Sequence, residues 1–106
     1  MNIRKERAKD HKVIYAVVRD AFGSAEHADG NEQDLVNALR QGEAYVPELS
    51  LVAEEKGKII GHIMFTKARV GETVVLALAP LSVLPEYQGK GIGTALIKKD
   101  IELHKG

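Results

Sequence analysis

Residues 85–97 read PEYQGKGIGTALI and place three glycines, Gly89, Gly91 and Gly93, at alternate positions. The apolar run TVVLALAPLSVL ends directly before this stretch, and the run ALIKKDIELHK within and after it has apolar residues at helical spacing. A strand that leads through a glycine loop into a helix presents unpaired backbone N–H groups at the positive end of the helix dipole. Such a loop is an anion site, most often for phosphate, although a tight connection with nothing bound is the alternative.

The chain on either side of the loop predicts one α/β domain. Its 106 residues leave room for a single domain, and the apolar pattern changes from helical spacing to strand spacing at residue 49. The predicted order is β-α-α-β-β-β-α. The elements are an edge strand at 2–6, a helix from an Asp10 N-cap to Phe22 stopped by Gly23, a loop at 23–30, a helix from Asn31 ended by Gly42, strands at 49–55, 59–70 and 73–85, and a helix from Gly91 to His104.

Apolar spacing also predicts which residues face the core. They are Val13, Ile14, Val17, Val18, Ala21 and Phe22 in the first helix, Leu35, Val36 and Leu39 in the second, and Ile92, Leu96, Ile97 and Ile101 in the last. The strand at 73–85 is apolar on both faces, so we expect it to be central and covered on both sides. Pro80 has no N–H to donate to a sheet, so it predicts a bulge or a local loss of pairing in this strand.

Composition narrows the range of partners. Lys plus Arg and Asp plus Glu both number 15, so no excess of positive charge favours nucleic acid or an acidic membrane as the main partner. The chain has no cysteine, and its first residues lack the apolar stretch of a signal peptide. Four scattered histidines without paired spacing predict no metal site. A cytoplasmic protein is therefore the default expectation.

The loop fits neither of the two best-known phosphate motifs, because its glycine spacing matches neither GxxxxGK[ST] nor GxGxxG. The stretch PLSVLPEYQGKGIGTALI instead resembles the acetyl-CoA motif of the GNAT superfamily of N-acetyltransferases, whose core is Q/R-x-x-G-x-G/A. Gln88, Gly91 and Gly93 fill its three places, and the preceding V-x-P at residues 83–85 is also typical of the family. The predicted order of elements matches the family over the whole chain.

The resemblance implies an enzyme that transfers an acetyl group from acetyl-CoA to the amine of a small molecule or peptide. The CoA pyrophosphate would accept hydrogen bonds from the backbone around Gln88, Gly89, Lys90, Gly91, Ile92, Gly93 and Thr94. The pantetheine arm would lie along the preceding strand at Leu81, Ser82 and Val83, where a backbone N–H would stabilise the oxyanion. A complete family domain continues with a parallel strand, a helix and a hairpin, so residues 1–106 are expected to be its cofactor-binding part.

The catalytic groups are less evident. Residues 74–84 contain no ionisable side chain, and the tyrosine acid of many family members has no counterpart up to residue 106. We therefore expect little amine acetylation at neutral pH and more at high pH. Within the segment SAEHADGNE, which contains Glu26, His27 and Asp29, Glu32 is the best candidate to hold a cationic amine or relay a proton. The alternative is a solvated loop with acids at a helix start.

Two other residues are expected to have structural roles: His62 on a strand surface and Ser82 within its strand. Two alternatives to an enzyme stay open. One is a non-catalytic acyl-CoA-binding or regulatory module that kept the loop without the chemistry. The other is an interaction fragment that pairs with a second copy, which predicts a homodimer or higher association around residues 74–84 and the last helix, because exposed strand edges are rarely left bare.

Overall fold

The computed structural model describes residues 1–22 and 32–105 of the 106-residue chain. The predicted helix stop at Gly23, the loop at 23–30 and the cap at Asn31 lie outside the described residues. Within the described parts, the elements follow the predicted order. No helix among them is both long enough and apolar enough to cross a lipid bilayer.

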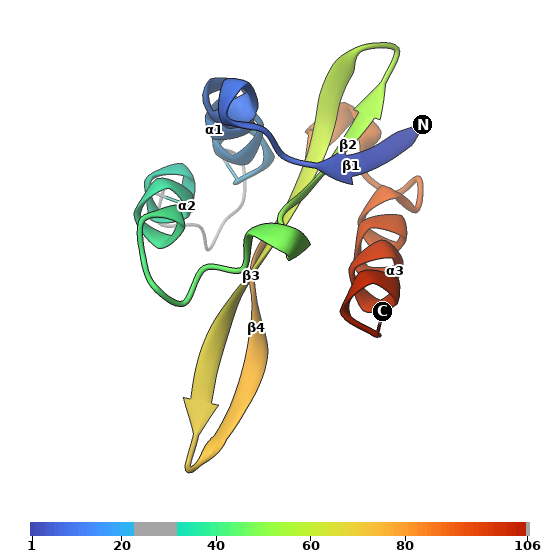
Figure 1. Ribbon diagram of the computed structural model, residues 1–106. Coiled ribbons are helices and arrows are strands. Elements are labelled where there is room, and N and C mark those ends of the chain that lie inside the picture. Colours follow the sequence, from blue (N-terminus) through green and yellow to red (C-terminus); the bar gives the residue numbers. More distant parts are fainter. Residues whose placement is uncertain (23–31, 106) are drawn as a thin grey trace.

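Four strands form one antiparallel sheet in the order β1-β2-β3-β4, as Figure 1 shows. Helices α1 and α2 lie on one face of the sheet and α3 lies on the other, so the molecule has three layers. This arrangement confirms the α/β class. The strands are β1 (Asn2–Lys5), β2 (Leu51–Glu55), β3 (Lys58–Val70) and β4 (Thr73–Val83), and the helices are α1 (His11–Phe22), α2 (Glu32–Arg40) and α3 (Ile92–Lys105).

The core lies between these layers. Ile14, Val17 and Val18 of α1 are buried against one face of the sheet, and Ile92 and Leu96 of α3 are buried against the other. Three residues predicted to face the core do not, because a helix that covers a sheet buries only one stripe of its surface. Val13, Leu35 and Ile101 are each about half exposed, with relative exposures of 47%, 49% and 49%.

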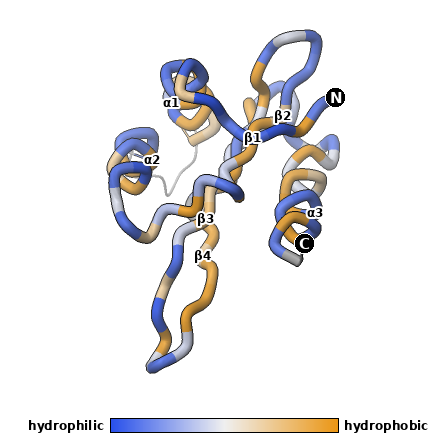
Figure 2. Tube along the Cα trace, in the orientation of Figure 1, coloured by the Kyte–Doolittle hydropathy of each residue, from blue (hydrophilic) through white to orange (hydrophobic). Residues whose placement is uncertain are grey.

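Strand β4 differs from its prediction in one respect and agrees in another. It is the last strand of the described sheet and pairs only with β3. Its side chains Val74, Val75 and Leu78 are exposed. The expectation that this strand is central and covered on both sides was therefore wrong. The outer half of the β3–β4 hairpin extends beyond the helices, and its β4 side is strongly apolar (Figures 1 and 2). The predicted irregularity at Pro80 is confirmed, because β4 holds one residue more than β3 where the register shifts.

The start of α1 also differs from its prediction. A 3-10 turn, η1 (Ala8–Asp10), leads directly into α1, so Asp10 lies inside the helical run and is not its N-cap. The Asp10 carboxylate accepts a hydrogen bond of 2.8 Å from the backbone N–H of Arg7 and an ion-paired hydrogen bond of 2.8 Å from Arg4 of β1. These bonds, of which the one from Arg4 contributes most, lower the pKa of Asp10. Asp10 therefore fixes the helix start against the sheet.

Candidate active site

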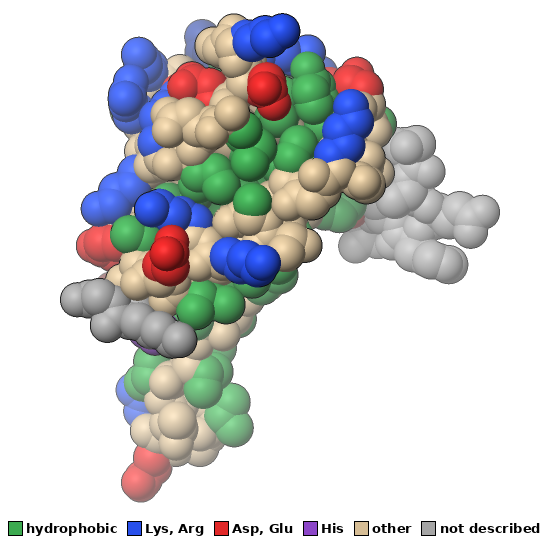
Figure 3. Space-filling view, turned by 90° about the vertical axis from the view of Figure 1, so that its right-hand side faces the viewer, with side chains coloured by type: hydrophobic (Ala, Val, Ile, Leu, Met, Phe, Trp, Pro, Cys, Tyr) green, Lys and Arg blue, Asp and Glu red, His purple; other side chains and the backbone are tan. Residues whose placement is uncertain are grey.

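A surface pocket of about 330 Å³ lies where β4 ends and α3 begins. Residues of both elements and of the glycine loop that connects them contribute to it. The lining residues are Leu81, Val83, Tyr87, Gln88, Gly89, Gly91, Ile92, Gly93, Thr94 and Ile97. All residues predicted to bind the cofactor are among them except Ser82 and Lys90. Figure 3, seen from the α3 side, shows apolar side chains across the middle of this face with both basic and acidic side chains around them.

The glycines of the loop have two different reasons to be glycine. Gly89 and Gly91 have φ values of +77° and +83°, which residues with a side chain rarely adopt, and a Cβ on either would meet no atom within 4 Å. Their backbone is therefore open to an approaching ligand. A Cβ on Gly93 would instead lie 3.3 Å from the Leu81 side chain, so this glycine lets α3 pack closely on β4.

The loop is held in place by its own residues and by the helix. The Gln88 side chain donates a hydrogen bond of 2.9 Å to the carbonyl of Val83, which ties the loop to the end of β4. The N–H of Ala95 donates to the carbonyl of Gly91 at 3.0 Å and so begins the helical bonds of α3. The N–H groups before it belong to the helix N-terminus, where an anion is favoured.

Two lysines lie beside this pocket. The ammonium groups of Lys58 and Lys90 lie 5.9 Å and 5.4 Å from the centre of the Tyr87 ring, within the range of cation–π contacts. Lys90 comes from the loop itself, whereas Lys58 begins β3 and is brought to the loop only by the fold. Sequence reasoning missed Lys58, because the turn KGK looks like any polar hairpin end.

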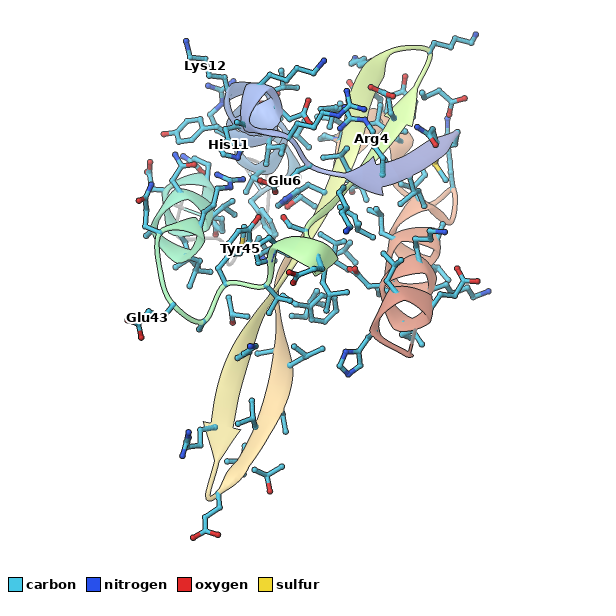
Figure 4. The ribbon with its side chains drawn as sticks, viewed as in Figure 1. Arg4, Glu6, His11, Lys12, Glu43 and Tyr45 are labelled. Atoms are coloured by element: carbon cyan, nitrogen blue, oxygen red, sulfur yellow. The ribbon has the colours of Figure 1, made fainter. Side chains whose placement is uncertain are left out.

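A second, buried polar cluster lies on the opposite face of the sheet, between the sheet and the two helices α1 and α2. Its centre is Glu6, the residue directly after β1, and the Glu6 side chain is 5% exposed (Figure 4). Glu6 Oε1 accepts hydrogen bonds from His62 Nε2 at 2.9 Å and from the hydroxyl of Ser50. Its other oxygen, Oε2, pairs with Arg40 Nε at 2.8 Å and with His11 Nε2 at 3.0 Å.

Burial and hydrogen bonding act against each other at the centre of this cluster. Burial raises the pKa of Glu6, but the hydrogen bonds from His62, Ser50 and Arg40 together outweigh it and lower the pKa to about 2. Burial is also the largest effect on His62, and it lowers the pKa of this histidine more than Glu6 raises it. The expectation that His62 lies on a strand surface was wrong, because its exposure is 0%.

Comparison with known proteins identifies the chain. A family model of the Acetyltransferase (GNAT) family matches residues 7–105. The chain belongs to the GNAT family of acetyltransferases. Its sequence is 42% identical over 97 residues to the uncharacterized N-acetyltransferase YjhQ of Escherichia coli strain K12. The matched region covers 88% of this chain and 51% of that protein. It is 33% identical over 85 residues to a mycothiol acetyltransferase of Parafrankia, which covers 77% of this chain and 25% of that protein.

The fold of this GNAT chain agrees with a solved structure. The crystal structure of a GNAT family acetyltransferase from Brucella melitensis in complex with acetyl-CoA matches with a TM-score of 0.89 and 39% sequence identity. The match covers 98% of this chain and 68% of that one. The chain spans about half the length of the Escherichia coli relative and a quarter of the Parafrankia relative.

The predicted acidic site is described only in part. Glu32 is the first residue of α2 and does not line the pocket at the glycine loop, whereas Glu26, His27 and Asp29 lie outside the described residues. Within residues 1–22 and 32–105, no group of three or more His, Asp or Glu side chains is arranged to hold a metal ion.

Proposed function

We propose that this chain is the cofactor-binding part, residues 1–106, of an acetyl-CoA-dependent N-acetyltransferase that acetylates an amine of a small molecule or peptide. The observation that carries the proposal is the pocket at the QGKGIG loop, which opens at a helix N-terminus in a chain of the GNAT family. The Brucella melitensis relative, whose fold is so similar, is described in complex with acetyl-CoA.

The loop residues fit the pyrophosphate of CoA. Gly89 and Gly91 leave empty the space that a Cβ would fill, so phosphate oxygens can reach the backbone N–H groups of residues 88–94. Lys90 and Lys58 add positive charge beside Tyr87, where it attracts the phosphates of the ligand. We assign cofactor contacts to Gln88, Gly89, Lys90, Gly91, Ile92, Gly93 and Thr94.

The free edge of β4 fits the pantetheine arm. Leu81 and Val83 line the pocket, and the bulge at Pro80 interrupts the ladder next to them. Bound acetyl-CoA would supply an acetyl thioester at this edge. The backbone N–H groups of residues 81–83 would stabilise the negative charge that develops on the carbonyl oxygen during attack by the amine. Glu32, at the start of α2, is proposed to hold the acceptor amine while it is still cationic.

We also propose that the protein is cytoplasmic and associates with a second copy through β4. The exposed side chains Val74, Val75 and Leu78 support association, because a bare apolar edge strand tends to pair with another strand. Neither nucleic acid nor a membrane is proposed as a partner, since positive and negative side chains are equal in number.

The test uses the purified chain and two measurements. The first is release of the CoA thiol from acetyl-CoA in the presence of a panel of amines, and the second is binding of acetyl-CoA by calorimetry. Thiol release that depends on an amine, with acetylated product seen by mass spectrometry, is the expected result. Binding without any turnover would instead favour a non-catalytic acyl-CoA-binding module. Absence of binding would refute the proposed site.

A further inference from the structure

Two lysine side chains from different elements meet at one aromatic ring beside the glycine loop. The ammonium groups of Lys58 and Lys90 lie 5.9 Å and 5.4 Å from the centre of the Tyr87 ring, so they are at most about 11 Å apart. Both side chains are exposed, and neither forms an ion pair within residues 1–22 and 32–105, where Lys99 is the one lysine that pairs with a carboxylate. The two charges are therefore available to an anionic ligand.

The pairing of β3 with the end of β4 brings Lys58 to this position. The backbone N–H of Leu84, directly after β4, donates a hydrogen bond of 2.9 Å to the carbonyl of Ile60. The 3-10 turn η3 (Pro85–Tyr87) follows, and the N–H of Tyr87 donates to the carbonyl of Leu84 at 2.9 Å. Lys58, the first residue of β3, is thus fixed beside the turn that carries the Tyr87 ring.

Lys58 also lines a second surface pocket, of about 400 Å³, whose other walls come from β1, η1, α1 and the turn between β2 and β3. Tyr87 lines the pocket at the glycine loop. Lys58 therefore lies between the two pockets: its ammonium faces the Tyr87 ring, and its side chain forms part of the wall of the second pocket.

The charges of the second pocket favour an anion. Its basic side chains are Arg4, Lys9 and Lys58, and its acidic side chains are Asp10 and Glu54. The Arg4 guanidinium pairs with both acids, at 2.8 Å to Asp10 and 3.3 Å to Glu54. After this pairing, the ammonium groups of Lys9 and Lys58 remain as the positive charges of the pocket, and they attract negative charge to it.

The phosphates of CoA form two groups that match two separate cations. One group is the pyrophosphate, and the other is the 3′-phosphate, which is attached to the same ribose and carries about two negative charges at neutral pH. Lys90 belongs to the loop whose backbone N–H groups fit the pyrophosphate, whereas Lys58 comes from another strand and borders the second pocket. A lysine ammonium is a compact charge with three donors, which suits a terminal phosphate.

We propose that Lys58 binds the 3′-phosphate of CoA and so makes the chain selective for CoA over dephospho-CoA, which lacks only that phosphate. The inference rests on the proposed binding of acetyl-CoA at the glycine loop. Lys90 interacts with the pyrophosphate, and Lys9 adds positive charge on the far side of the second pocket. Lys58 determines ligand specificity and takes no part in the chemistry of acetyl transfer.

The experiment is calorimetric titration of CoA and of dephospho-CoA into the wild type, Lys58→Gln, Lys90→Gln and the control Lys67→Gln. Lys67 is an exposed lysine of the same strand, so its replacement changes the net charge equally. We expect the wild type to bind CoA about fivefold more tightly than dephospho-CoA, and this ratio to shrink as salt is added. Lys58→Gln should bring the ratio to within about twofold of one by weakening CoA alone. Lys90→Gln should weaken both ligands by the same factor, and Lys67→Gln should change neither Kd.

Phosphorus-31 NMR of bound CoA gives a readout that does not depend on affinity. A phosphate monoester loses its second proton near pH 6, about where the 3′-phosphate is expected to titrate, and the pyrophosphate has no proton to lose in that range. An ammonium group beside the 3′-phosphate stabilises its dianion and lowers this pKa. At saturation, the pKa of the 3′-phosphate should therefore be lower on the wild type than on Lys58→Gln.

The outcomes that would overturn the inference are distinct from those that would overturn the proposed function. Equal weakening of CoA and dephospho-CoA in Lys58→Gln would place Lys58 at the pyrophosphate and overturn the inference. The same holds for a 3′-phosphate pKa that is equal on the wild type and Lys58→Gln, or for a wild type that binds both ligands equally well. A wild type that binds neither ligand would overturn the proposed cofactor site and the inference with it.

Discussion

Asp100 of α3 gives the sharpest prediction about stability. It is 2% exposed, and neither of its carboxyl oxygens has a hydrogen-bond partner among the described residues. Burial raises the pKa of Asp100 from 3.8 to about 7. The carboxyl borders an apolar pocket of about 140 Å³, and the pocket is lined by Leu49, Phe65, Leu76, Asp100, Ile101 and His104.

The raised pKa determines the sign of the pH dependence. Because the folded state holds this proton more tightly than the unfolded state, the contribution of Asp100 is most favourable below pH 3.8 and is lost as the pH rises toward 7. Each pKa unit corresponds to about 1.4 kcal/mol. In a fully dry site, ionisation of the carboxyl would therefore lower the free energy of unfolding by about 4 kcal/mol at high pH. Because the pocket is partly open to solvent, we expect the free energy of unfolding to fall by only about 2 kcal/mol between low and high pH.

The assay is urea unfolding of the wild type and Asp100→Asn at pH 4 and pH 8. Asparagine has nearly the same shape and stays neutral, so the free energy of unfolding of the variant relative to the wild type should rise by about 2 kcal/mol between the two pH values. Glu102→Gln is the control, because the Glu102 side chain on the same helix is 72% exposed and should show no such change. An equal difference between wild type and Asp100→Asn at both pH values would refute the reasoning.

Three further predictions concern other parts of the molecule. Lys58→Glu should raise the Kd for CoA about three- to tenfold, and more at low salt, whereas Lys67→Glu on the same strand should leave it unchanged. Calorimetric titrations that give the same Kd for both variants would exclude Lys58 from the site. Leu78→Lys should convert a dimer to a monomer in light scattering with an unchanged circular dichroism spectrum; a wild type that is already monomeric at high micromolar concentration would contradict association through β4. Glu6→Gln should lower the free energy of unfolding by about 3 kcal/mol at pH 7. The difference between variant and wild type should vanish as the pH falls from 4.5 toward 2, because Glu6 stabilises the fold only while its carboxylate is ionised. Chemical denaturation across that pH range measures this, and a difference that does not depend on pH would contradict it.

The sequence predicts the parts of this fold that depend on neighbouring residues. The glycine loop, the helix after it and the bulge at Pro80 each follow from the conformational limits of Gly or Pro in a short segment, and each is present in the structure. The residues that line the pocket are contiguous or nearly so, so that motif spacing is enough to bring them together. Local signals of this kind need no knowledge of the tertiary packing.

The buried cluster could not be predicted in the same way. Glu6 and His62 are 56 positions apart, and each looks like an ordinary polar residue in its own segment. Their contact depends on β1 pairing with β2 and β2 with β3, and the burial of His62 depends on α1 and α2 covering that face. The exposure of Val13 and Ile101 was missed for a related reason, because apolar spacing shows that a helix has an apolar face but not how far the neighbouring layer extends.

The most direct test of the central claim, that acetyl-CoA binds at the QGKGIG loop, is calorimetric titration of acetyl-CoA into the wild type and Gly91→Asp. Gly71→Asp is the matched control, because Gly71 also has a positive φ and open space at its Cβ position but lies in the β3–β4 turn. Backbone strain is thus similar in the two variants, and only Gly91→Asp places a carboxylate where the pyrophosphate is expected. We predict binding at least about 100-fold weaker in Gly91→Asp and unchanged in Gly71→Asp, since juxtaposed like charges cost several kcal/mol. Equal affinity of the folded wild type and folded Gly91→Asp for acetyl-CoA would contradict the account.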